Sequence, residues 1–273
     1  MAVGALDVKI RSSPNERVEL ARLTKTLSEV RLALAEIDRV YVLRGRRPRW
    51  VVSSLRDYPD SLLVRLTAGA TRRRDTSSML APAEALVSGV DALQREPEVP
   101  QYYTESTVDR VLKIGEPGQG VSEVSLATVN GKVDIDYVPV SEPVRQHARE
   151  AVRGAETSLG SVAGWLDQMN ARRFGKGVLV VSLFDSLTRR AVTGYVPAAM
   201  ESQVHELWRR RVLARGRVTR NGRGQVVRIN IEGFELLPED GGARVPVDEL
   251  LGIDQDWIGG QDVDEYVREA RRA

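Results

Sequence analysis

Two aspartates that flank a single residue, Asp134 and Asp136, have a spacing that could do chemistry. Carboxylate oxygens in such an Asp-x-Asp pair are suitable ligands for a divalent cation. The neighbouring residues Val133, Ile135 and Tyr137 alternate with them, however, and this alternation is typical of a strand with one apolar and one polar face. The pattern favours aspartates on a solvated strand face over a metal site, so no metal ion is expected.

Other reactive side chains are sparse. The two histidines, His147 and His205, each fall in a predicted helix among charged neighbours, and no Ser/His/Asp grouping is apparent. The chain has no cysteine, which excludes cysteine nucleophiles, disulfides and thiolate metal sites. The glycine-rich segment 115–120 has no phosphate-loop lysine and precedes a strand, whereas a phosphate loop follows one. The sequence therefore predicts a protein that is not an enzyme and has no cofactor.

Charge is distributed unevenly along the chain. The net charge is only +2, from 40 Lys and Arg residues against 38 Asp and Glu residues. Residues 171–228 nevertheless carry thirteen basic and three acidic residues, whereas residues 232–265 carry eleven acidic residues and one arginine. Such an asymmetry indicates a basic binding segment followed by an acidic tail. The abundance of arginine also has a simpler explanation, a GC-rich genome.

The first half of the sequence predicts helices packed on antiparallel hairpins. Residues 6–11 alternate as a strand, and Ser13, Pro14 and Glu16 are typical of a helix start. Apolar residues then recur every three or four positions as far as Tyr41, which favours one long helix lying on a sheet over a coiled coil. The other predicted elements are hairpins at 50–67 and 121–138 and helices at 82–95, 104–114 and 143–153. The fold class expected for residues 1–156 is therefore an α+β layer domain.

The pattern changes after Gly160. Strands are predicted at 161–170, 178–184 and 190–196, a helix at 197–210, and two further strands at 211–219 and 225–232. The last two are joined at Asn221-Gly222, a dipeptide typical of two-residue hairpin turns. This order, three strands, one helix and two strands, resembles the OB-fold, a five-stranded Greek-key barrel. Small SH3-like barrels are the main alternative. The resemblance implies a barrel at 157–238, followed by an acidic tail with a short helix at 239–273.

The resemblance also implies where a ligand would bind. OB-folds bind oligonucleotides on the second and third strands and with the loops that join strands one to two and four to five. Those loops here are 171–177 and 220–224, and both carry glycine and positive charge. Single strands need cations for phosphates and aromatic rings for bases. The expected contacts are Arg172, Arg173, Phe174, Lys176, Arg220 and Arg223. Tyr195 offers a second ring if it points out of the barrel.

The acidic tail supports a different function class. Trp257, Ile258 and Tyr266 are apolar anchors in an otherwise acidic segment, as in peptides that dock on a protein. The tail could fold back on the basic barrel, or it could bind a separate basic protein. In the second case the chain would be a protein-binding regulator, such as an antitoxin that neutralises a basic nuclease. No apolar run is long enough to cross a membrane and no signal-peptide pattern is present, so a cytoplasmic location is expected.

Overall fold

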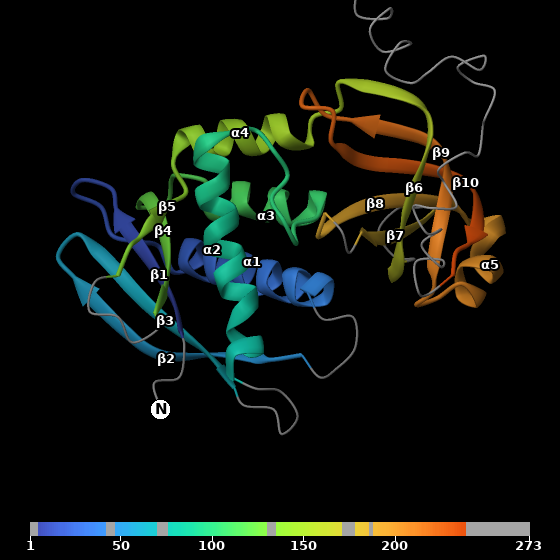
Figure 1. Ribbon diagram of the computed structural model, residues 1–273. Helices are drawn as coiled ribbons and strands as arrows, with labels where there is room; N and C mark the ends of the chain where they lie inside the picture. Colours follow the sequence, from blue (N-terminus) through green and yellow to red (C-terminus); the bar gives the residue numbers. More distant parts are fainter. Residues whose placement is uncertain are drawn as a thin grey trace, which may run out of the picture. The chain divides into compact units, whose positions relative to one another are not determined.

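The computed structural model describes residues 5–41, 47–69, 76–129, 135–170, 178–185 and 188–238 (Figure 1). The chain divides into two units, Met1–Leu236 and Leu237–Ala273. The predicted tail at 239–273 lies outside the described residues. An open sheet with helices and a closed barrel make up the first unit, which confirms the predicted α+β fold class.

A five-stranded antiparallel sheet organises the N-terminal half, in the order β2-β3-β1-β4-β5. Its strands are β1 (Ala5–Ser12), β2 (Arg49–Tyr58), β3 (Ser61–Gly69), β4 (Val121–Val129) and β5 (Val138–Pro139). The first strand of the chain lies at the centre, because the β2–β3 hairpin pairs on one side of it and β4 on the other. In the second half of the predicted 121–138 hairpin, residues 130–134 lie outside the described residues, residues 135–137 are not in a strand, and Val138 begins the two-residue β5.

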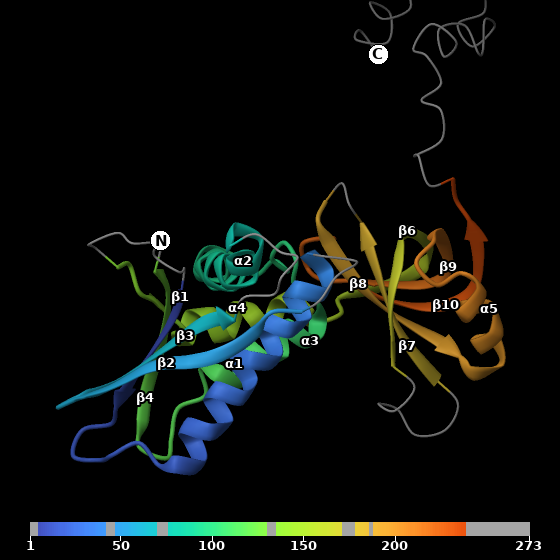
Figure 2. The ribbon, with the colours of Figure 1, turned by 90° about the horizontal axis from the view of Figure 1, so that it is seen from below.

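Four helices cover one face of this sheet (Figures 1 and 2). They are α1 (Leu20–Tyr41), α2 (Thr76–Arg95), α3 (Glu105–Ile114) and α4 (Glu142–Val152). Val30, Leu34 and Ile37 of α1 are fully buried in the layer core, so the long helix packs on the sheet as predicted. Its predicted start at Ser13 is wrong. Asn15 has a φ of 64°, which interrupts a helix, and α1 begins only at Leu20.

The C-terminal half of the first unit is a closed five-stranded barrel in the order β10-β8-β7-β6-β9. Its strands are β6 (Glu156–Asn170), β7 (Val178–Asp185), β8 (Arg190–Pro197), β9 (Arg211–Arg220) and β10 (Val226–Leu236). Strands β8 and β10 are parallel, and the other neighbours are antiparallel. The short helix α5 (Glu201–Glu206) lies between β8 and β9. This topology is consistent with an OB-like barrel.

Closure of the barrel depends on β6, the longest strand. Its first part pairs with β9, from Glu156 opposite Arg220, and its last part pairs with β7, as far as Asn170 opposite Val180. Glycines allow neighbouring strands to approach closely at two points, Gly164 of β6 against β7 and Gly216 of β9 against β10. A Cβ atom at Gly164 would lie 2.9 Å from the carbonyl oxygen of Phe184, and one at Gly216 would lie 2.0 Å from that of Asn230. At these two points a side chain would prevent the close packing of the neighbouring strands.

Candidate nucleic-acid interface

The structure describes two of the predicted nucleic-acid contacts, Arg220 and Arg223, at the connection between β9 and β10. The other predicted site residues lie outside the described residues: Arg172, Arg173, Phe174 and Lys176 in the loop between β6 and β7, and Trp257, Ile258 and Tyr266 in the tail. The structure nevertheless shows where the 171–177 loop is attached, because β6 ends at Asn170 and β7 begins at Val178.

The β9–β10 connection differs from the predicted two-residue turn. It spans residues 221–225, with the backbone N–H of Asn221 donating to the carbonyl of Gln225 at 2.9 Å. The left-handed residue is Gly224, with a φ of 77°. The Asn221 side chain closes the turn, since its Oδ1 accepts the backbone N–H groups of Arg223 and Gln225 at 3.0 Å each. The Asn221 side chain thus holds a longer turn closed, and the two positive φ values that a two-residue turn of type I′ needs are not required.

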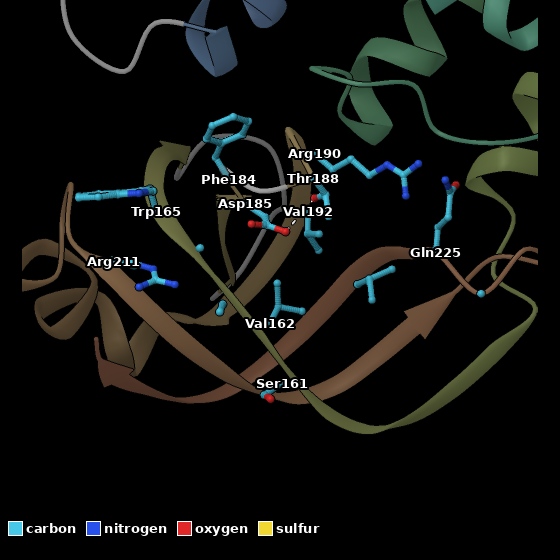
Figure 3. A pocket seen from close by; sticks show the side chains of 14 residues that line it. Ser161, Val162, Trp165, Phe184, Asp185, Thr188, Arg190, Val192, Arg211 and Gln225 are labelled. Atoms are coloured by element: carbon cyan, nitrogen blue, oxygen red, sulfur yellow. Dashed lines mark hydrogen bonds between the residues drawn. The ribbon is translucent and has the colours of Figure 1, made fainter. Parts of the chain in front are cut away.

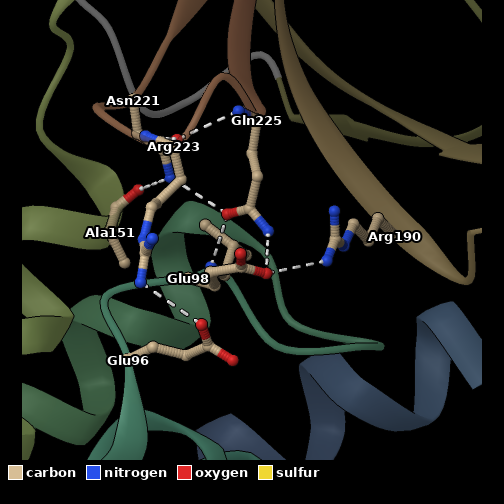
Figure 4. A network of polar contacts seen from close by, with 8 residues as sticks. Glu96, Glu98, Ala151, Arg190, Asn221, Arg223 and Gln225 are labelled. Carbon is tan, nitrogen blue, oxygen red and sulfur yellow. Dashed lines mark hydrogen bonds and ion pairs between the residues drawn. The ribbon is translucent and has the colours of Figure 1, made fainter.

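Polar contacts join this turn to the layer domain (Figure 4). Asn221 Nδ2 donates to the carbonyl of Ala151, the last turn of α4, at 2.9 Å. Gln225 Oε1 accepts the N–H of Val99 at 2.8 Å, and its Nε2 donates to Glu98 at 2.8 Å. Asn221 is 3% exposed, so its bond to Ala151 forms away from solvent, whereas the two bonds of Gln225 are part-buried. The turn therefore holds the barrel to α4 and to the segment between α2 and α3.

Glutamates of the layer domain neutralise arginines of the barrel. The ion pairs are Arg223–Glu96 at 3.3 Å, Arg190–Glu98 at 3.3 Å and Arg228–Glu105 at 3.5 Å. Burial raises the pKa of Glu105, and the charge of Arg228 opposes that rise. Arg220 donates to the carbonyl of Gly224 within the turn. Arg220 and Arg223, the two described members of the predicted nucleic-acid contacts, therefore both already bond to other groups of the protein. Sequence reasoning missed these glutamates because they are far from the barrel in the chain.

A groove of about 800 Å³ lies on the outer surface of β8 and β10. Val178, which directly follows the 171–177 loop, lines it together with Thr219, which directly precedes Arg220. The groove therefore lies between the attachment points of the two loops that the sequence predicts as binding loops. Tyr195 lines it and is half-buried, between the buried residues Gly194 and Val196. Because side chains alternate along a strand, Tyr195 faces out of the barrel.

A second pocket, of about 410 Å³, opens at one end of the barrel (Figure 3). Trp165 and Arg211 form one wall, and Arg190 and Gln225 point away towards the layer domain. Phe184 lines the same pocket and stacks on Tyr102 of the layer domain, with ring centroids 6.4 Å apart. Three residues that line this pocket, Phe184, Arg190 and Gln225, therefore already contact residues of the layer domain. The groove at Tyr195 is the better candidate for a ligand.

Asp167 lies three residues before the end of β6, next to the 171–177 loop. Burial raises its pKa to about 6, while the positive charges of Arg47, Arg209 and Arg39 oppose the rise. The folded protein thus holds this proton more tightly than the unfolded chain does. Ionisation of Asp167 consequently destabilises the folded state as the pH rises from about 4 towards 7.

The variant Asp167→Asn is therefore expected to be more stable than the natural protein at pH 7.5 and about equally stable at pH 4. The expected gain at pH 7.5 is about 1 kcal/mol, because partial exposure reduces the full effect of the shift. Urea unfolding at the two pH values measures it. Asp91→Asn, a change in an exposed ion pair on α2, is the control. Parallel pH profiles for Asp167→Asn and the natural protein would contradict the prediction.

No three His, Asp or Glu side chains in the described ranges are grouped so that they could hold a metal ion. Of the predicted pair, Asp136 is exposed and Asp134 lies outside those ranges. His147 contacts the carbonyl of Leu93 at 2.8 Å, which ties α4 to α2. None of the described helices is long and apolar enough to cross a membrane. Comparison with protein families, with curated proteins and with solved structures finds no match, so the interpretation of the groove depends on its own residues and geometry.

Proposed function

We propose that the protein is a non-enzymatic, cytoplasmic binder of single-stranded nucleic acid and that the groove at Tyr195 is its binding site. One observation carries the proposal: an outward-facing tyrosine lines a groove that begins where the basic 171–177 loop joins the barrel. Bases would stack on the Tyr195 ring, and each stacked base contributes about 1–3 kcal/mol in proteins of this class. Arg172, Arg173 and Lys176 would contact the phosphates, and Phe174 would stack on a second base.

The arginines of the β9–β10 turn have a smaller role in this proposal than the sequence predicts. Arg220 and Arg223 already bond to Gly224 and Glu96, so a phosphate would have to compete for them. Arg228 lines the groove itself, although it is also engaged: it pairs with Glu105 at 3.5 Å and donates to the carbonyl of Val152 at 3.2 Å. A phosphate could bind it at the shorter distance typical of charge-assisted hydrogen bonds.

Replacement of Tyr195 by leucine is expected to weaken oligonucleotide binding by about tenfold, because leucine fills similar space but offers no ring for stacking. Fluorescence anisotropy of a labelled thymidine 15-mer measures the change. Tyr195→Phe is the matched variant, since it keeps the ring and loses only the hydroxyl, and its affinity should stay close to that of the natural protein. Equal loss in both variants would show that the hydroxyl, rather than stacking, matters.

The electrostatic part of the proposal is tested in the same titrations. The logarithm of the affinity should fall with the logarithm of the salt concentration, with a slope of about −0.7 for each phosphate contacted. Arg172→Ala should reduce the size of that slope. Arg11→Ala, which removes the same charge from the layer domain, should leave it unchanged. If no oligonucleotide binds at low salt, the proposal is wrong, and the acidic tail with Trp257 and Tyr266 becomes the place to seek a protein partner.

A further inference from the structure

Strand β2 is one edge of the five-stranded sheet, and its outer backbone edge has no strand partner among the described residues. The opposite edge strand, β5, is two residues long and ends in Pro139, two features that discourage pairing with another chain. β2 has ten residues and contains neither proline nor lysine. Arg49, Arg56 and Asp57 place charge on this edge, but its length and its lack of proline leave its backbone groups available to an additional strand.

The side chains of β2 are apolar where they face solvent. Within the described part of the chain, eight large apolar side chains are exposed, and four of them are in this strand. They are Val51 at 49%, Val52 at 56%, Leu55 at 54% and Tyr58 at 44%. Both faces of the strand are involved, so exposure follows the edge rather than one face of the sheet. A cluster of this kind indicates a surface that another chain covers.

A β-bulge gives β2 an unusual symmetry. Its pairing with β3 skips Ser53, so that Val52 lies opposite Leu66 and Leu55 opposite Val64. Leu66 and Val64 are both buried in the layer core, which places Val52 and Leu55 on the same face of the sheet. Two residues of β2 at equal distances on either side of the midpoint between Ser53 and Ser54 therefore point to the same face of the sheet.

We propose that a second copy of the chain pairs with β2, antiparallel, about a two-fold axis at the Ser53–Ser54 midpoint. A regular strand would pair with its copy about an axis through a residue, because about an axis between two residues the opposed side chains would point to different faces. The bulge removes that conflict, since Val52 and Leu55 of the second copy share a face. The two sheets thereby join into one of ten strands. The bulge therefore determines where the two-fold axis of such a pair lies.

The remaining pairs in this register also fit. Trp50 lies opposite Asp57 of the second copy, Val51 opposite Arg56, and Arg49 opposite Tyr58. No pair places like charges directly opposite each other, and arginine beside a tyrosine ring is a favourable contact. This agreement depends on both strands having the same sequence, which favours a second copy over an unrelated partner. Ten residues a side are fewer than the roughly 20–30 of a standard interface, so we expect a dissociation constant in the micromolar range.

Sedimentation velocity of the full chain, from about 1 to 200 µM, should show a monomer that converts to a dimer as the concentration rises. Leu55→Lys should raise the dissociation constant about tenfold, because each cross-strand pair contributes about threefold and two-fold symmetry counts the change twice. Leu159→Lys is the matched control, an equivalent change at an exposed leucine of the barrel, 78% accessible, and it should leave the dimer intact. A monomer at every concentration, or a Leu55→Lys dimer of unchanged strength, would overturn the proposal.

Disulfide trapping tests the register itself, since the natural chain has no cysteine. Val52→Cys and Leu55→Cys, mixed and oxidised, should form a covalent dimer because the two residues are directly opposed. Either variant alone should remain monomeric on a denaturing gel. Its two cysteines would be about 10 Å apart along the strand, beyond the span of a disulfide. Crosslinking of a single variant, or none in the mixture, would exclude this register.

Discussion

Replacement of Arg65 by leucine is expected to lower the free energy of unfolding by about 3 kcal/mol, the low end of the usual cost of breaking a buried ion pair from one side, because the Arg65 side chain is 32% exposed. The Asp7 side chain is 0% exposed and lies at the centre of the five-stranded sheet. Arg65 donates to both of its oxygens, at 2.7 and 2.8 Å. Without Arg65, the Asp7 carboxylate keeps one side-chain hydrogen-bond donor among the described residues, the hydroxyl of Tyr137 at 3.1 Å.

The protonation states of the partners support this expectation. Hydrogen bonding to Asp7 raises the pKa of Arg65, so its guanidinium is charged throughout the usable pH range. Burial, together with the charge of Asp7, raises the pKa of Tyr137 to about 12. Tyr137 is therefore a neutral donor at neutral pH and cannot replace the positive charge of Arg65.

Urea unfolding of three variants separates the buried pair from ordinary surface charges. The double variant Asp7→Leu, Arg65→Leu should recover most of the loss, because it leaves no unpaired charge in the sheet. Arg95→Ala, which breaks the exposed Arg95–Asp91 pair on α2, should cost less than about 0.5 kcal/mol. A double variant no more stable than Arg65→Leu would mean that the pair contributes through its shape rather than its charge.

The barrel was predictable because its information is local. Alternation at 211–219 and the helix between the third and fourth strands are both visible over short windows of sequence, and they match β9 and α5. The predicted helix at 197–210 is longer than α5, because residues 207–210 leave the helix before β9 begins. Tyr195 shows the limit of this reasoning. Alternation relates it to Gly194 and Val196, but only the packed barrel determines which face of the strand is inside.

The contact between the barrel and the layer domain could not be predicted from local pattern. Glu98 and Gln225 are 127 positions apart in the chain, and nothing in either segment indicates the other. The same reason explains the turn. Asn221-Gly222 is typical of a two-residue hairpin when only the strands are considered, whereas α4 provides a distant carbonyl, that of Ala151, for the asparagine side chain. Long-range hydrogen bonds are thus the reason why the turn type and the contacts of its arginines differ from the prediction.

Replacement of Asn221 by alanine is expected to lower the free energy of unfolding by about 3 kcal/mol. The change removes four hydrogen bonds of a side chain that is 3% exposed. It leaves the N–H groups of Arg223 and Gln225 and the carbonyl of Ala151 without that partner, and each such group costs about 1 kcal/mol or more. Arg223→Ala is the control in the same turn. Its exposed pair with Glu96 should contribute at most about 0.5 kcal/mol.

The variant Asn221→Asp distinguishes attachment of the barrel from ligand binding. It keeps an oxygen for the N–H groups of Arg223 and Gln225, so the turn still closes, but it cannot donate to Ala151. If the turn serves attachment, stability should fall by about 1–3 kcal/mol, while oligonucleotide affinity stays within about threefold because Tyr195 is on a different strand. A loss of affinity at unchanged stability would contradict that division and would return Arg220 and Arg223 to the binding surface.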